Sequence, residues 1–232
     1  MAKDLQPIFD AAVVVLVDTR NVHEPKIFLG RRRADNVFLP DKWVFPGGRC
    51  EEADQIIQPM GSLSDADIEA LDWQPASSRQ KVSAGLGVTA VREVFEETGL
   101  IIGAAGHMSD PVPESWQTFA ATGYRPSLDG LKFLARAITP PARPRRYDTR
   151  FFIASAHAIV HDAGRHDGEF TEQGWFTLTQ CRALDIPNIT RLILDDACTA
   201  IEHGDLSTKN GIPFYFQDGS AFRRDLITRR KG

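Results

Sequence analysis

The sequence predicts a mixed α/β fold, and three observations support this prediction. Residues 11–17 form a continuous apolar run, which is typical of a strand buried on both faces. The segment 92–100, REVFEETGL, has apolar residues at helical spacing and a glycine at its end. Along the rest of the chain, strand-like and helix-like segments alternate irregularly. This pattern favours a layered fold with a mixed sheet over a strict βαβ repeat.

The first elements follow from local patterns. The turn-rich stretch 18–25 and the apolar stretch 26–30 predict that the first strand continues into a hairpin. A short apolar strand at 43–45 runs into a Pro-Gly-Gly turn. Ser64 and Asp67 form a capping box, which predicts one short helix in an acidic stretch of the chain.

The longest helix is expected to end at Gly99, a good left-handed C-cap. Its start is expected near Ser77 or Ser78. Gly85 and Gly87 would each cost a helix about 1 kcal/mol, so a start after Gly87 is the alternative.

The second half of the chain is predicted to continue the alternation. We expect helices at 114–122, 179–184 and 189–203, strands at 131–138, 151–160 and 175–178, an edge strand at 212–216, and a C-terminal tail from about residue 205 that carries Arg223, Arg224, Arg229, Arg230 and Lys231.

Composition limits the class of protein. The chain of 232 residues fits a single domain over 1–232, and its 42% hydrophobic and 25% charged residues are ordinary for a globular protein. The net charge of −4 argues against a dedicated nucleic-acid partner, and no apolar run is long enough to span a membrane. Three widely spaced cysteines, with no CxxC pair and no leader-like N-terminus, predict a cytoplasmic protein. A homodimer is compatible with the sequence.

Three acids crowd one face of the longest predicted helix. Glu93, Glu96 and Glu97 fall within an arc of about 100°, opposite the apolar residues Val91 and Val94. Like charges one turn apart weaken a helix, so such a cluster indicates a cation that neutralises it. An all-oxygen donor set suits Mg²⁺ or Mn²⁺ and does not suit zinc. The simpler alternative is a solvated acidic face.

The glycine turn and the acidic helix together resemble the signature of the Nudix hydrolases. That signature reads G, five residues, E, seven residues, then REUxEExGU, where U is a bulky aliphatic residue. The segment 92–100 matches every fixed position of the right-hand half. The resemblance implies an α/β/α sandwich with a mixed β-sheet and a metal-dependent hydrolase of diphosphate linkages.

The left half of the signature is interrupted. Counting forward from Gly48 gives Asp54 as its glutamate, whereas counting back from Arg92 gives Ala84, because an insertion at about 55–79 separates the two halves. A long insertion here, together with the stretch RRYDTRFF at 145–152, resembles the peroxisomal coenzyme A diphosphatase-like branch. The insertion is predicted to be a surface lobe that either shapes substrate choice or serves as decoration.

The resemblance and the diphosphate chemistry together give the expected site. Glu96 and Glu97 are expected as metal ligands, with Glu93 as a third ligand and a catalytic residue, and the Gly48 turn is expected to add a backbone carbonyl. Arg92 is expected to hold a carboxylate, for example that of Glu96, in position.

The general base is expected on a distant loop. Glu172 and then Glu169 are favoured, because they precede the strand at 175–178, and Asp54 is a weaker candidate. The neighbouring His161 and His166 fit solvated turns better than zinc ligands.

Two groups of arginines are candidates for binding the phosphates of the substrate, because guanidinium groups match phosphate oxygens. Arg31 and Arg33 would point to one side of the second strand by alternation. Arg145, Arg146 and Arg150 precede the strand predicted to begin at Phe151, and Arg146 and Arg150 are the favoured members of this group.

The predicted substrate is a nucleotide-derived small molecule. Coenzyme A or its acyl esters are favoured because of the interrupted signature, and ADP-ribose, NADH and dinucleotide polyphosphates remain alternatives. A non-catalytic Nudix module that senses a nucleotide is the alternative from another class. The intact acid cluster argues against it, because a binding module has no need for three clustered acids.

Overall fold

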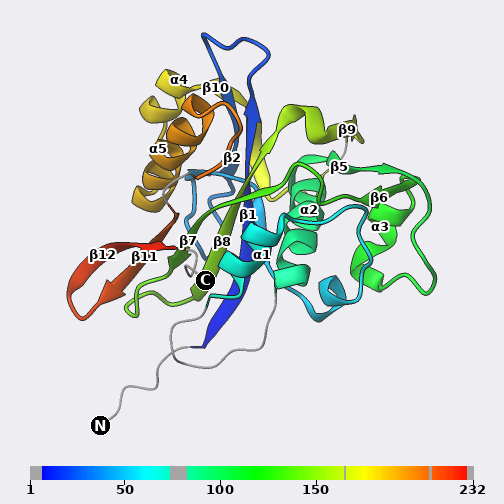
Figure 1. Cartoon of the computed structure of the whole chain (residues 1–232), viewed down its shortest axis with the longest axis horizontal. Helices are drawn as coiled ribbons and strands as arrows, with labels where there is room; N and C mark the ends of the chain where they lie inside the picture. The colour runs from blue at the N-terminus through cyan, green and yellow to red at the C-terminus, as the bar shows by residue number, and fades with distance from the viewer. Residues whose placement is uncertain (1–6, 74–82, 165, 209–210, 229–232) are drawn as a thin grey trace.

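The computed structural model describes residues 7–73, 83–164, 166–208 and 211–228, and a mixed β-sheet lies at its centre (Figure 1). β1 pairs in parallel with β8 and antiparallel with β2 and β4. The strand order is β10 (Phe170–Thr177), β2 (Lys26–Arg32), β1 (Ile8–Asp18), β8 (Arg146–Ser155), β7 (Lys132–Ile138), β11 (Ile212–Asp218) and β12 (Ala221–Ile227), with β3 (Trp43–Val44) beside β2 and β4 (Gly47–Arg49) beside β1.

Helices cover both faces of this sheet (Figure 1). Along β1, Val14 and Leu16 pack in one core with the apolar face of α2 (Ser83–Thr98). The alternate residues Val15 and Val17 pack in a second core with α4 (Leu178–Ala183) and α5 (Asn188–Glu202). The apolar run at 11–17 is therefore buried on both faces, and the α/β/α sandwich predicted from the sequence is confirmed.

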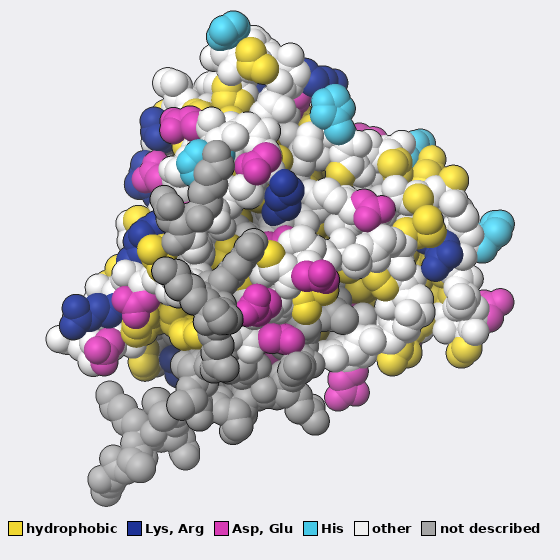
Figure 2. Space-filling view, viewed as in Figure 1, with side chains coloured by type: hydrophobic (Ala, Val, Ile, Leu, Met, Phe, Trp, Pro, Cys, Tyr) yellow, Lys and Arg dark blue, Asp and Glu magenta, His cyan; other side chains and the backbone are white. Residues whose placement is uncertain are grey.

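The described part of the insertion lies on the α2 side of the sheet. It contains α1 (Asp65–Leu71), and the 3₁₀ helix η1 (Glu52–Gln55) leads into it. The predicted cap is confirmed, because the Ser64 hydroxyl accepts a hydrogen bond of 3.1 Å from the Asp67 backbone. Leu63 and Leu71 join the core beneath α2, while acidic side chains gather over α1 on the outer surface (Figure 2).

α2 begins at Ser83, and the predicted start near Ser77 or Ser78 falls outside the described residues. Gly87 lies inside the helix. A Cβ added to it would lie 3.0 Å from the Leu128 side chain, so close packing against Leu128 explains why a glycine occupies this helical position. Gly99 ends the helix with φ +79° and confirms the predicted C-cap. No described helix has both the length and the apolar character needed to cross a membrane.

A second, three-stranded sheet flanks α2 and was not predicted. It consists of β6 (Tyr124–Pro126), β5 (Leu100–Ala105) and β9 (Ile159–Asp162). The strand predicted at 151–160 is confirmed at 151–155 within β8 but is not continuous, because Ser155 caps the short helix η3 (Ala156–Ala158), which separates β8 from β9. The helix expected at 114–122 is divided into η2 (Glu114–Trp116) and α3 (Gln117–Ala120).

The C-terminal segment is a hairpin, where the sequence predicted a tail from about residue 205. β11 is internal and β12 forms the edge of the large sheet. Tyr215 anchors the hairpin, because its hydroxyl donates a 2.7 Å hydrogen bond to Asp196 and accepts one of 3.1 Å from Arg224. Residues 229–232 lie outside the described residues.

Candidate active site

The glycine turn between β3 and β4 contacts the acidic end of α2. The Gly47 backbone N–H donates a 2.8 Å hydrogen bond to Glu97 Oε2. A Cβ on Gly48 would lie 2.5 Å from Glu93 Oε2, so only glycine allows this carboxylate to approach the turn. Gly47 has φ +154°, and a Cβ there would lie 2.4 Å from the Ala12 carbonyl oxygen. The two glycines therefore shape the place where Glu93 and Glu97 meet β4.

Arg92 forms ion pairs with two of the acids, and one of them is Glu96, the partner that the sequence suggested. Its side chain is 3% exposed, and Nη1 lies 2.7 Å from Glu96 Oε2 and 2.9 Å from Glu93 Oε1. Its Nη2 also donates to the Arg49 carbonyl oxygen at 3.0 Å. Arg92 thus ties the helix to β4 and fixes two of the three carboxylates. This is a positioning role.

Asp54 stands where the interrupted signature needs its first acid. It forms a two-pronged ion pair with Arg92, at 2.8 Å and 3.0 Å, and is fully buried. It also accepts hydrogen bonds from Thr89 Oγ1 and Trp116 Nε1. The forward count from Gly48 therefore identifies this acid. An acid with these partners and no exposed surface cannot serve as a general base toward water, so the weaker candidate Asp54 is wrong in that role.

The electrostatics of the cluster disfavour its charged form. Burial raises the pKa of Glu93 to about 8 despite the adjacent Arg92. Burial, together with the charges of Glu93 and Glu169, raises the pKa of Glu97 well above its usual value. The pKa of Glu96 is also raised by burial. Carboxylates buried this close to one another need positive charge before all of them ionise.

The donor set therefore fits a hard divalent cation, although the ligands do not form a closed cage. Glu93, Glu97 and Gly48 line the same cavity and offer only oxygen atoms. Glu96 is turned toward Arg92 and is absent from the lining. Among the described residues, no three acidic, histidine or cysteine side chains are close enough together to hold a metal ion by themselves.

A cavity of about 930 Å³ extends from the acids across the sheet. Its floor is formed by side chains of β1 and β8, including Val13, Tyr147 and Thr149. The described residues of the insertion, 55–73, contribute nothing to the lining. The described part of the insertion therefore does not shape this cavity directly.

Arg32 on β2 is a second arginine close to the acids, beside Arg92, and the sequence prediction missed it. Its Nη2 lies 2.6 Å from Glu169 Oε1, and its Nη1 lies 4.0 Å from Glu97 Oε1. Phe28 faces the α2 core from the same strand, so counting in steps of two from Phe28 would have placed Arg32 on the α2 side. Arg33 lines the cavity but pairs with Asp35 at 2.9 Å.

Arg31 and Glu172 lie outside the cavity. They pair with each other at 2.7 Å on the outer surface, with side chains 40% and 56% exposed, and neither lines the cavity. The predicted substrate contact of Arg31 and the preferred base Glu172 are therefore not supported by the structure. Glu169, which directly precedes β10, does line the cavity.

Arg146 and Arg150 are also placed away from the cavity. Alternation along β8 sends them to the buried side, while Tyr147 faces the cavity. Arg150 is 2% exposed and pairs with Asp10 at 2.6 Å. Arg146 donates to the Thr139 carbonyl oxygen at 3.1 Å. Both predictions of substrate contact fail, because these guanidinium groups are used inside the fold.

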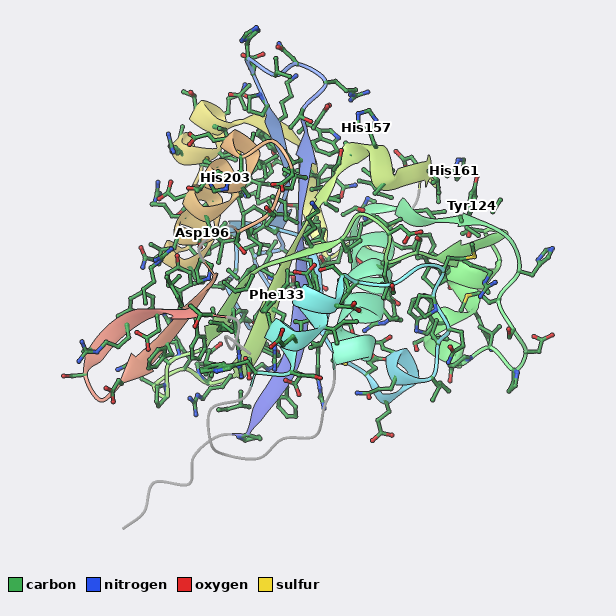
Figure 3. All side chains as sticks on the ribbon, viewed as in Figure 1. Tyr124, Phe133, His157, His161, Asp196 and His203 are labelled. Carbon is green, nitrogen blue, oxygen red and sulfur yellow. The ribbon has the colours of Figure 1, made fainter. Side chains whose placement is uncertain are left out.

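The two histidines near the predicted base each contact a neighbouring group. His161 stacks on Tyr124 in the small sheet, with ring centroids 5.8 Å apart (Figure 3). His166 accepts a 3.1 Å hydrogen bond from the Gly168 backbone. Both side chains are exposed, but His161 lies in strand β9 and not in the turn that the sequence predicted.

Comparison with known proteins supports the fold. A Nudix hydrolase from Alicyclobacillus acidocaldarius has a similar structure, with a TM-score of 0.63, 23% sequence identity, and coverage of 88% of this chain and 97% of that chain. This likeness shows that the chain has the Nudix fold. No family model matches the chain.

The sequence also resembles an acyl-coenzyme A diphosphatase, NUDT19, of Gallus gallus. The two are 26% identical over an alignment of 174 residues, and the match covers 53% of this chain and 46% of the relative. The chain thus spans about half the length of the curated relative that it matches. Together the two comparisons confirm the resemblance to Nudix hydrolases and to the coenzyme A diphosphatase-like branch.

Proposed function

We propose that this chain, which has the Nudix fold, is a diphosphatase that hydrolyses the diphosphate linkage of a nucleoside diphosphate derivative and uses Mg²⁺ or Mn²⁺. One observation supports the proposal above all others. Glu93 and Glu97 meet the Gly47–Gly48 turn at one end of a cavity large enough for a nucleotide, and arginines line the same cavity.

The cation would be held by Glu93, Glu97 and the backbone of Gly48, with Glu96 as the further ligand expected from the sequence. When bound, it would lower the pKa of a water molecule and neutralise charge on the phosphate oxygens. The protein itself supplies the frame, because Arg92 and Asp54 fix α2 against β4.

Glu169 is the best candidate for accepting a proton from the attacking water. It lines the cavity, it is near enough to Glu97 to raise the pKa of that residue, and Arg32 holds it at 2.6 Å. Glu93 is the alternative base within the helix. Glu172 is too far out on the surface to take this role in the described conformation.

Coenzyme A or an acyl ester is the favoured substrate. The support is the likeness to an acyl-coenzyme A diphosphatase and the interrupted Nudix signature. ADP-ribose, NADH and dinucleotide polyphosphates remain the alternatives. A nucleotide-sensing module is disfavoured, because burying Glu97 beside the largely buried Glu93 is costly and is useful mainly when a cation is bound there.

A hydrolysis screen tests the proposal. Coenzyme A, acetyl-coenzyme A, ADP-ribose, NADH and diadenosine tetraphosphate would each be incubated with the protein and Mg²⁺ or Mn²⁺. We expect metal-dependent cleavage of one P–O–P linkage by water, which leaves one phosphate of that linkage on each of the two products, fastest with a coenzyme A substrate. Binding without turnover of any compound would instead favour the sensing module. Location in the cytoplasm and assembly as a homodimer stay predictions.

A further inference from the structure

Two arginines at the far end of the cavity have no acidic partner among the residues that the structure describes. Arg143 and Arg145 belong to the loop between β7 and β8, line the cavity and are exposed. In the described chain, neither side chain forms an ion pair or hydrogen bond. Arg32 and Arg33, by contrast, are paired with Glu169 and Asp35. The loop therefore presents positive charge that the protein does not itself neutralise.

These arginines are too distant to bind the diphosphate held at the acids. Gly48 pairs with Ala12, and Ala12 pairs with Arg150 on β8. Arg145 precedes Arg150 by five residues, which corresponds to about 16 Å along an extended chain. An anion bound at the loop is therefore a separate group from the one bound beside Glu93.

Aromatic side chains lie between the two ends. Tyr147 and Phe38 line the cavity and form an edge-to-face pair, with ring centroids 5.5 Å apart. Phe222 from β12 also contributes to the lining, although its side chain is 52% exposed. These rings offer flat apolar surfaces to a nucleotide base.

We propose that Arg143 and Arg145 bind a phosphate group on the ribose of the substrate, distinct from the diphosphate that is hydrolysed. The proposal rests on the proposed function and deepens it. Guanidinium groups bind phosphate oxygens through paired N–H donors, and two arginines match the double charge of a phosphate monoester. The loop would then select nucleotides with a phosphorylated ribose over those without, and so would favour coenzyme A over ADP-ribose.

Calorimetric binding of nucleotide fragments tests the site without turnover. Adenosine 3′,5′-bisphosphate, adenosine 2′,5′-bisphosphate and AMP would be titrated into the wild-type protein and into Arg143→Gln, Arg145→Gln and the double variant. We expect a bisphosphate to bind about tenfold more tightly than AMP, and this preference to be largely lost in the double variant. The 2′ and 3′ isomers show which ribose phosphate fits.

Arg223→Gln is the matched control, because Arg223 is exposed on β12 and lies outside the cavity lining. It should keep the wild-type preference. Raising the salt concentration should reduce the preference in the wild-type protein, because the arginines are exposed to solvent. Equal binding of AMP and both bisphosphates, or a preference unaffected by the double substitution, would overturn the proposal.

Kinetics separate this proposal from the proposed function. The ratio of kcat/KM for coenzyme A to that for dephospho-coenzyme A, which lacks only the ribose phosphate, should fall about tenfold in the double variant. Hydrolysis of both at equal rates by the wild type would refute the phosphate site but leave the diphosphatase intact. Absence of all hydrolysis, with bisphosphate binding retained, would refute the enzyme and leave the site.

Discussion

Replacing Asp54 by alanine is expected to destabilise the protein strongly, because Asp54 neutralises the buried Arg92. The carboxylate is fully buried and accepts hydrogen bonds from Arg92, Thr89, Trp116 and the Glu51 backbone. Removing it leaves a guanidinium group with 3% exposure and a buried indole N–H without their acceptor.

The size of the effect follows from these contacts. Removing one partner of a buried ion pair typically costs about 3–5 kcal/mol, and an unpaired buried donor costs about 1–3 kcal/mol. Glu93 and Glu96 remain near Arg92 and offset part of the loss. We therefore expect the free energy of unfolding to fall by about 3–5 kcal/mol.

Urea unfolding at neutral pH measures this change. Asp185→Ala is the matched control, because Asp185 pairs with Lys42 but its side chain is 69% exposed, and its loss should cost less than about 1 kcal/mol. Asp54→Asn preserves the shape and isolates the charge. A loss below about 1 kcal/mol for both Asp54 variants would refute the reasoning.

The same effect should depend on pH. Burial alone would raise the pKa of Asp54, but the hydrogen bonds and charge of Arg92 outweigh burial and hold this pKa below its usual value. A lowered pKa stabilises the folded state above the unfolded value of about 4, and this contribution disappears as pH falls through the folded pKa. The stability difference between wild type and Asp54→Asn should therefore shrink below about pH 4.

Three further predictions concern the site. Gly48→Ala should displace Glu93 and reduce turnover at least about tenfold while unfolding stays cooperative, and unchanged turnover would show that the close approach is unimportant. Glu169→Gln should lower turnover by about 10²–10⁴-fold and Glu172→Gln hardly at all, and the reverse order would restore Glu172 as the base. Arg150→Ala should lower the unfolding midpoint without raising KM, whereas a rise in KM alone would indicate a substrate contact.

The sequence predicted the parts of the fold that depend on local patterns. The run at 11–17, the capped helix after Ser64 and the end of α2 at Gly99 all follow from periodicity or capping, and the structure confirms them. β5, β6 and β12 were missed, because each is a strand only through its pairing with a partner. Such pairing depends on tertiary contacts that a local pattern does not contain.

The site was predicted unevenly for similar reasons. The helix period puts Glu93 and Glu97 on one face, and both line the same cavity, while the spacing of one turn puts Glu96 beside Arg92; their roles stay predictions. Whether an arginine faces the cavity depends on which side of the sheet its side chain occupies. The sequence prediction used alternation along the strand but had no residue of known side, such as Phe28, from which to start counting. The buried Arg150 illustrates the consequence, because a charged residue in a strand looks the same in sequence whether it binds phosphate or a neighbouring aspartate.

The central claim is that Glu97, with a divalent cation, is required to hydrolyse a diphosphate. The most direct measurement is the rate of coenzyme A cleavage with Mg²⁺ or Mn²⁺, and with a chelator, for wild type, Glu97→Gln and the control Glu52→Gln, since Glu52 is exposed and outside the cavity. We predict cation-dependent cleavage by wild type and Glu52→Gln, and a loss of at least about 10²-fold in Glu97→Gln. Full activity of Glu97→Gln, or cleavage that persists in excess chelator, would contradict the account.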